Sequence, residues 1–102
     1  MTYRNRKLLN LAHSMPCMAS FPHQCTQHQG CEPAHANGLI WGKGVGFKAP
    51  DHYFASMCHN AHDAIDNKLN KTLSADERPQ EWLRAYISTQ DWLWENGKLN
   101  VK

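Results

Sequence analysis

The feature that most constrains this chain is its supply of metal-binding side chains, with four cysteines and seven histidines in 102 residues. A chain of this length buries only a modest apolar core, because small domains keep much of their surface in water. Additional cross-links are therefore expected to hold the fold together. Two disulfides are one possibility, but histidines crowd the same segments as the cysteines. In a chain expected to be intracellular, this combination favours metal ligation.

Length and charge limit the class of protein. One chain of 102 residues is expected to form a single domain over residues 1–102. The formal net charge of +2 is smaller than the basic excess of a dedicated nucleic-acid-binding tail. No stretch approaches the roughly 18 apolar residues of a membrane span. The segment Leu8–His13 is too short and too polar for the apolar part of a signal peptide. We therefore expect a cytoplasmic protein without a membrane partner.

The chain divides into three stretches. Residues 3–13 are predicted to form a short basic helix, which Pro16 stops from continuing. Residues 16–56 are rich in proline and glycine, and are expected to form loops and short strands. Apolar residues spaced by three and four then predict a helix from Cys58 to Leu69.

A second helix is predicted over about residues 75–97. Ser74 and Glu77 have the spacing of a capping box, and Gly97 is placed to end the helix. Six large apolar side chains are expected to share one broad face of this helix. Packing against the core is the favoured role for that face, and stacking on nucleic-acid bases is the alternative. The six are Trp82, Leu83, Tyr86, Ile87, Leu93 and Trp94.

The cysteines suggest a structural zinc site. Cys17, Cys25 and Cys31 lie in the loop-rich stretch, while Cys58 is expected at the start of a helix. Zinc commonly takes one pair of ligands from a loop and another from a helix start, so these four are predicted to form an all-cysteine site. A mixed site that uses His28 or His59 instead of one cysteine stays open, and so does a set of buried thiols.

A second possible cation site lies on the same predicted helix. His62 and Asp66 are four residues apart and therefore share one helix face, where both side chains can approach one ion. Such pairs are common on protein surfaces, so the pair gains weight only if another histidine is brought near it. His35, which precedes a glycine-rich stretch, is the candidate.

Three segments together resemble a known family: residues 33–37 (PAHAN), 42–51 (GKGVGFKAPD) and 57–66 (MCHNAHDAID). They are similar to the zinc-containing HNH endonucleases, and in particular to the small prophage-encoded nucleases of the YbcO-like group. The resemblance extends over roughly residues 3–98. It implies an α+β protein with a small, zinc-stapled ββα-metal core over about residues 16–70, flanked by N-terminal and C-terminal helices.

The resemblance also implies an activity, the metal-dependent hydrolysis of DNA phosphodiester bonds by a phage or prophage enzyme. His35 matches the general base, Asp51 falls near the middle position of the motif, and His62 matches its last histidine. His62 and Asp66 are expected to hold a catalytic Mg²⁺ or Mn²⁺ ion. An imidazole with a pKa of about 6.5 suits the deprotonation of water near neutral pH.

The partner expected from this activity is the DNA backbone. Lys43 and Lys48 flank glycines of a loop that can approach phosphates closely, and are predicted to bind them. Two other roles stay open: a non-catalytic zinc module that binds nucleic acid, and one that binds a host protein complex as an anti-defence inhibitor. The low net charge favours the second of these over the first.

Overall fold

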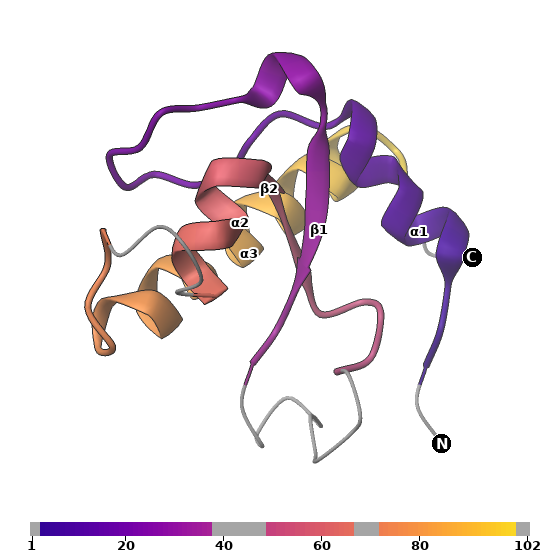
Figure 1. Ribbon diagram of the computed structural model, residues 1–102. Helices are drawn as coiled ribbons and strands as arrows, with labels where there is room; N and C mark the ends of the chain where they lie inside the picture. Colours follow the sequence, from indigo (N-terminus) through magenta and orange to yellow (C-terminus); the bar gives the residue numbers. More distant parts are fainter. Residues whose placement is uncertain (1–2, 38–48, 67–71, 100–102) are drawn as a thin grey trace.

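Two short antiparallel strands lie at the centre of the fold (Figure 1). The computed structural model describes residues 3–37, 49–66 and 72–99. Strand β1 (Cys31–His35) pairs with strand β2 (Phe54–Cys58), in a register that places Cys31 opposite Cys58 and His35 opposite Phe54. The predicted α+β class is confirmed, with a two-stranded sheet and three α-helices in the described part of the chain.

The helices surround this sheet (Figure 1). Helix α1 (Arg6–Asn10) continues into a 3-10 helix, η1 (Leu11–Ser14), which lies beside β1. A second 3-10 helix, η2 (Gln27–Gln29), precedes β1. Helix α2 (His59–Asp66) follows β2 directly and contacts both strands. Helix α3 (Glu77–Glu95) packs along β2 and against α2.

Pro33 is tolerated inside β1 because of its position in the pairing. It faces Ser56 of β2, whose backbone groups turn away from β1. The Ser56 N–H donates to the Thr89 hydroxyl at 2.9 Å, and the Ser56 carbonyl accepts from the Met18 N–H at 2.9 Å. The N–H that proline lacks is therefore not needed at this point of the ladder. The same two bonds tie β2 to α3 and to the segment before η2.

The larger of two buried apolar clusters is built mainly from small side chains. Half of its fourteen buried members are alanines, among them Ala34 on β1, Ala61 on α2 and Ala85 on α3. Alanine lets backbones approach closely but removes little apolar surface from water, so the hydrophobic stabilisation of this core is limited. The Trp82 indole adds a specific contact, since it is buried and its N–H donates to the Ala34 carbonyl at 2.9 Å.

Both ends of α3 follow the predicted local signals. The Ser74 N–H donates to the Glu77 carboxylate at 2.8 Å, and the Glu77 N–H donates to the Ser74 hydroxyl at 3.2 Å, which confirms the capping box. At the other end Gly97 has φ +67°, and the Lys98 N–H donates to the Leu93 carbonyl at 2.9 Å. This is a Schellman motif, as expected for a glycine that ends a helix.

The apolar face predicted for this helix is divided. Trp82 and Leu93 are buried, whereas Leu83, Ile87 and Trp94 are 42%, 55% and 50% exposed. The prediction that all six apolar residues line the core was therefore wrong. Helical spacing alone does not distinguish a residue that packs in the core from a nearby residue of the helix that stays in contact with solvent.

Two other predicted boundaries also differ. Cys58 is the last residue of β2 instead of the first residue of a helix, because the buried run Phe54–Cys58 is extended. Helix α2 begins one residue later and is described to Asp66, and the predicted end at Leu69 lies outside the described residues. The N-terminal helix predicted over residues 3–13 is observed as α1 and η1, which together span residues 6–14.

Candidate functional site

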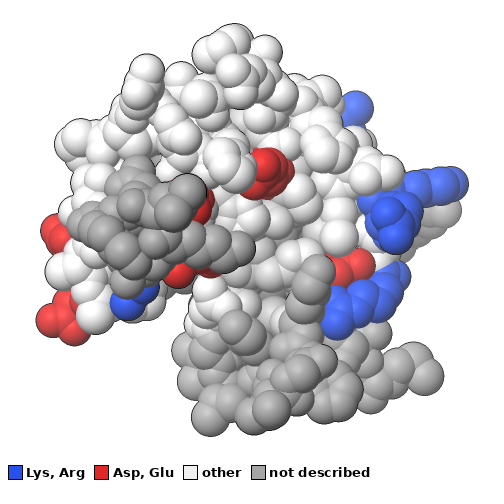
Figure 2. Space-filling view, viewed as in Figure 1, with Lys and Arg blue, Asp and Glu red and all other residues white. Residues whose placement is uncertain are grey.

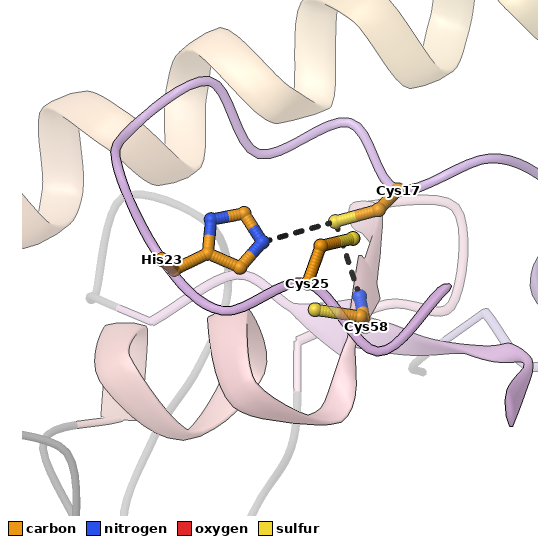
Figure 3. Close-up of side chains that lie close together, drawn as sticks. All are labelled: Cys17, His23, Cys25 and Cys58. Carbon is orange, nitrogen blue, oxygen red and sulfur yellow. Dashed lines mark hydrogen bonds between the residues drawn. The ribbon is translucent and has the colours of Figure 1, made fainter. Parts of the chain in front are cut away.

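Four side chains converge at the junction of β2 and α2 (Figure 3). Potential ligand atoms of Cys17, His23, Cys25 and Cys58 all lie within 4.8 Å of one another, and we call these residues the metal-ligand group. The first three come from the segment before η2, and Cys58 ends β2. All four cysteines are free thiols, so no disulfide competes for them. Three sulfurs and one imidazole form one of the ligand sets that zinc takes in structural sites.

The orientation of His23 suits this role. Its Nδ1 atom lies 2.8 Å from the Phe21 carbonyl, to which it donates a hydrogen bond. With the proton on Nδ1, the lone pair is on Nε2, which points toward Cys17 Sγ at 3.8 Å (Figure 3). A backbone carbonyl that fixes the tautomer of a ligand histidine is a common feature of zinc sites.

Two thiols of the group, the buried Cys58 and the partly buried Cys17, are in different protonation environments. Burial acts to raise the pKa of Cys58, but hydrogen bonds from the backbone N–H groups of Thr26 and Ala61 outweigh it and lower the pKa. The Ala61 N–H lies in the first turn of α2, 3.4 Å from the Cys58 sulfur. Burial raises the pKa of Cys17. The local structure therefore favours a thiolate at Cys58, and thiolate is the form that binds metal.

Cys31, predicted as the fourth ligand, is outside the metal-ligand group. It lies on β1 directly opposite Cys58, it is 1% exposed, and burial raises the pKa of its thiol. The structure therefore differs from the all-cysteine set, and His23 stands in the fourth place. The alternatives His28 and His59 are not in the group either. His59 Nδ1 lies 3.0 Å from a Glu32 carboxylate oxygen instead.

The second candidate centre is the pair of His35 and Asp51. His35 Nε2, at the end of β1, lies 3.0 Å from Asp51 Oδ1, which also accepts from the Arg4 guanidinium at 2.9 Å. The Asn5 N–H donates to Oδ2 at 2.6 Å. Asp51 is 4% exposed, and although burial acts to raise its pKa, the bonds from His35, Asn5 and Arg4 lower it. Asp51 is thus an ionised carboxylate that holds the imidazole in one orientation.

The third group is centred on His62. Its Nε2 atom lies 3.3 Å from Asp66 Oδ2, as the spacing predicts for one face of a helix. Its Nδ1 atom lies 2.7 Å from Glu32 Oε1, and the Asn37 amide donates to Asp66 Oδ1 at 3.3 Å. The hydrogen bonds with Asp66 and Glu32 outweigh burial and raise the pKa of His62. Burial acts to raise the pKa of Glu32, but its hydrogen bonds with His62 and His59 outweigh this effect and lower it.

Glu32, like His23, was not predicted from the sequence. It reaches from β1 to two histidines of α2, His59 and His62, and so joins the sheet to the helix on the side of the Asp66 carboxylate. Its only signal in the sequence is its place three residues before His35. That spacing has no meaning until the register of β1 and the start of α2 are known.

The predicted phosphate-binding residues Lys43 and Lys48 lie outside the described residues. Elsewhere, positive charge is gathered near the N-terminus, where Arg4, Arg6 and Lys7 are exposed. Figure 2 shows blue side chains on the side of the molecule where α1 and the segment before it lie. Arg4 connects this charged region to the His35–Asp51 pair through its bond to Asp51.

Comparison with known proteins gives one structural neighbour. No family model and no curated protein matches the chain. The fold is similar to that of a protein ascribed to a bacteriophage, from Escherichia coli strain K-12 substrain MG1655, with a TM-score of 0.63. The two share 21% sequence identity, over 87% of this chain and 98% of the other. At this level of identity the likeness shows a shared fold.

None of the helices described in the structure combines the length and the apolar character needed to cross a membrane.

Proposed function

We propose that this chain is a phage- or prophage-encoded endonuclease of the HNH type, which hydrolyses DNA phosphodiester bonds with the help of a divalent cation. The observation that carries the proposal is the pairing of His35 with the buried Asp51 carboxylate. A histidine held in this way at the end of a strand has the orientation that a general base requires. The order β1, β2, α2 also agrees with the ββα-metal core that the sequence resemblance implies.

His35 would act as the base through Nδ1. The Asp51 carboxylate only accepts hydrogen bonds, so the contact at 3.0 Å requires a proton on Nε2 of His35. In the neutral imidazole Nδ1 then carries the lone pair that can take a proton from water. Asp51 stabilises the imidazolium that forms, and Arg4 and Asn5 keep Asp51 ionised. Asp51 is therefore a positioning residue in this mechanism.

His62 and Asp66 would hold the catalytic Mg²⁺ or Mn²⁺. The facing atoms Nε2 and Oδ2 are 3.3 Å apart, a separation that two ligands of one cation can adopt. The contact with Glu32 keeps a proton on Nδ1 of His62, so a cation bound between His62 and Asp66 would take the place of the proton on Nε2. When bound, the cation would stabilise charge on the phosphate and the leaving oxygen.

In this proposal the metal-ligand group binds a structural Zn²⁺. The zinc would connect the loop that carries Cys17, His23 and Cys25 to the end of β2, beside the alanine-rich cluster. The DNA backbone would be bound by Lys43, Lys48 and the exposed Arg6 and Lys7. A phage nuclease would act in the cytoplasm of the bacterial host.

Cleavage of supercoiled plasmid tests the proposal. The zinc-loaded protein is incubated with plasmid and either Mg²⁺ or Mn²⁺, beside His35→Ala and a chelator control. We expect metal-dependent nicking that falls at least about 100-fold in His35→Ala, because general-base catalysis contributes about 10²–10⁴-fold. His28→Ala is the matched control, since His28 is exposed and outside the site. Absence of cleavage by the folded, zinc-loaded wild type would refute the nuclease and favour a module that binds a host protein.

A further inference from the structure

The outward face of α3 carries an apolar stripe that the proposed nuclease does not use. Among the described residues four large apolar side chains are strongly exposed, and three of them are on this helix: Leu83, Ile87 and Trp94. Scattered exposed apolar residues are normal on a protein surface. A concentration of three on one helix is a different observation and points to a contact surface.

The spacing of these residues is that of a helix–helix contact. Leu83, Ile87, Gln90 and Trp94 stand at positions i, i+4, i+7 and i+11, which is the a/d repeat of a coiled coil. They form one stripe along about three turns. The buried stripe of α3, which includes Trp82, Ala85, Thr89 and Leu93, packs on the rest of the fold, so the outer stripe is a second, separate seam.

The charges beside the stripe indicate which helix fits it. Arg84 and Asp91 are both exposed, seven residues apart, and occupy the same heptad position on one flank of the stripe. When two copies of α3 run antiparallel, these equivalent flanks face each other, so Arg84 of one copy lies near Asp91 of the other. A parallel arrangement would place this flank opposite Tyr86 and Leu93, which offer no charge to either residue.

We propose that α3 pairs with α3 of a second copy of this chain, antiparallel about a two-fold axis. Leu83 then packs opposite Trp94 of the second copy, and Ile87 opposite Gln90. The pair of Arg84 from one copy and Asp91 from the other then occurs twice, as the symmetry of a closed dimer requires. The proposal is independent of the nuclease function, because none of these residues belongs to the metal-ligand group or to the histidine–carboxylate pairs.

The dimer is expected to be weak. Only four positions on each helix form the seam, and one of them is Gln90, so the contact is smaller than the roughly 800 Å² per partner of a standard interface. We expect a dissociation constant on the order of 10–100 µM. Sedimentation velocity of the zinc-loaded protein, from about 5 to 500 µM, covers this range. A wild type that stays monomeric throughout would overturn the proposal.

Three variants test the arrangement itself. Ile87→Glu should remove dimerisation at every concentration, whereas Ser88→Glu, a matched change at an exposed position off the stripe, should leave it unchanged. Arg84→Asp should weaken dimerisation about tenfold or more, since it sets like charges against each other. Adding Asp91→Arg to Arg84→Asp restores opposite charges, and should recover affinity to within about threefold of wild type.

The outcomes separate clearly. Circular dichroism of each variant is the control for folding, because it distinguishes loss of the dimer from loss of structure. If Ile87→Glu stays dimeric, the stripe is not the interface and the proposal fails. If the charge-reversed double variant stays as weak as Arg84→Asp, the antiparallel pairing is refuted.

Discussion

Replacing Asp51 with asparagine tests a buried carboxylate that accepts hydrogen bonds from three residues. Asp51 Oδ1 accepts from both Arg4 and His35, while Oδ2 accepts from the Asn5 N–H. Asparagine has nearly the same shape but presents one NH₂ group. In either orientation of the amide, that NH₂ faces a donor, the Asn5 N–H or the Arg4 guanidinium, so at least one partly buried hydrogen bond is lost.

The cost follows from these contacts. A hydrogen bond to a charged group contributes about 1.5–3 kcal/mol, and a buried donor without a partner adds about 1–3 kcal/mol. Because these donors are only partly buried, the second contribution is small here, and we expect Asp51→Asn to lower the free energy of unfolding by about 2–4 kcal/mol. For a domain of this size that corresponds to a fall in Tm of roughly 10–25 °C. Urea denaturation of the zinc-loaded protein measures the change directly.

The pH dependence gives a second, independent signature. The pKa of Asp51 is lower in the folded chain than its ordinary value of 3.8, so its bonds stabilise the fold above that pH. The difference in stability between wild type and Asp51→Asn should be constant near neutral pH. It should shrink as the pH falls below about 4, when the carboxylate becomes protonated.

The control is Asp76→Asn, because Asp76 is exposed and its side chain makes no capping bond at α3. It should change the stability by less than about 0.5 kcal/mol. An Asp51→Asn protein as stable as this control would show that the network around Asp51 contributes nothing, and the reasoning above would be refuted.

Two further predictions concern the other groups of the site. His23→Ala should reduce zinc affinity by at least ~100-fold, because it removes one of four ligands. Cys31→Ser should still bind about one zinc per chain. Competition with a chromophoric chelator measures both. Loss of zinc from Cys31→Ser alone would contradict this ligand set. Glu32→Gln should lower the pKa of His62 in metal-free protein, although Asp66 keeps it above the ordinary value, as followed by NMR titration. Glu95→Gln, an exposed change on α3, should leave the pKa of His62 unchanged. The same pKa of His62 in the wild type and in both variants would exclude a contact with Glu32.

Local signals in the sequence predicted local structure well. Two such signals are the capping box of Ser74 and Glu77 and the terminating Gly97. Both act over about one turn of helix, so the residues that make the contacts are only a few positions apart in the sequence. The end of β2 was not predicted in the same way. Phe54–Cys58 is buried throughout, and a short, fully buried strand has no alternating pattern by which to recognise it.

The metal-ligand group shows where sequence reasoning stops. Cys17, Cys25 and Cys58 were predicted, and they lie together. The choice of His23 over Cys31 depends on how the segment before η2 folds back on β2, which spacing does not reveal. Cys31 is close in sequence but is fixed by the register of β1. DNA cleavage, the catalytic cation and the roles of Lys43 and Lys48 stay predictions.

If the metal-ligand group binds zinc as proposed, the placement of its residues along the chain would also set an order for folding. Cys17, His23 and Cys25 fall within nine residues, so they can gather around an ion while the rest of the chain is still unfolded. Cys58 is 33 residues beyond Cys25, and β1 lies between them. An ion already held by three ligands would reduce the closure of that loop to the capture of one thiolate. This capture would bring β2 beside β1 and fix the residue before the start of α2. We therefore expect the rate of folding to depend on zinc concentration.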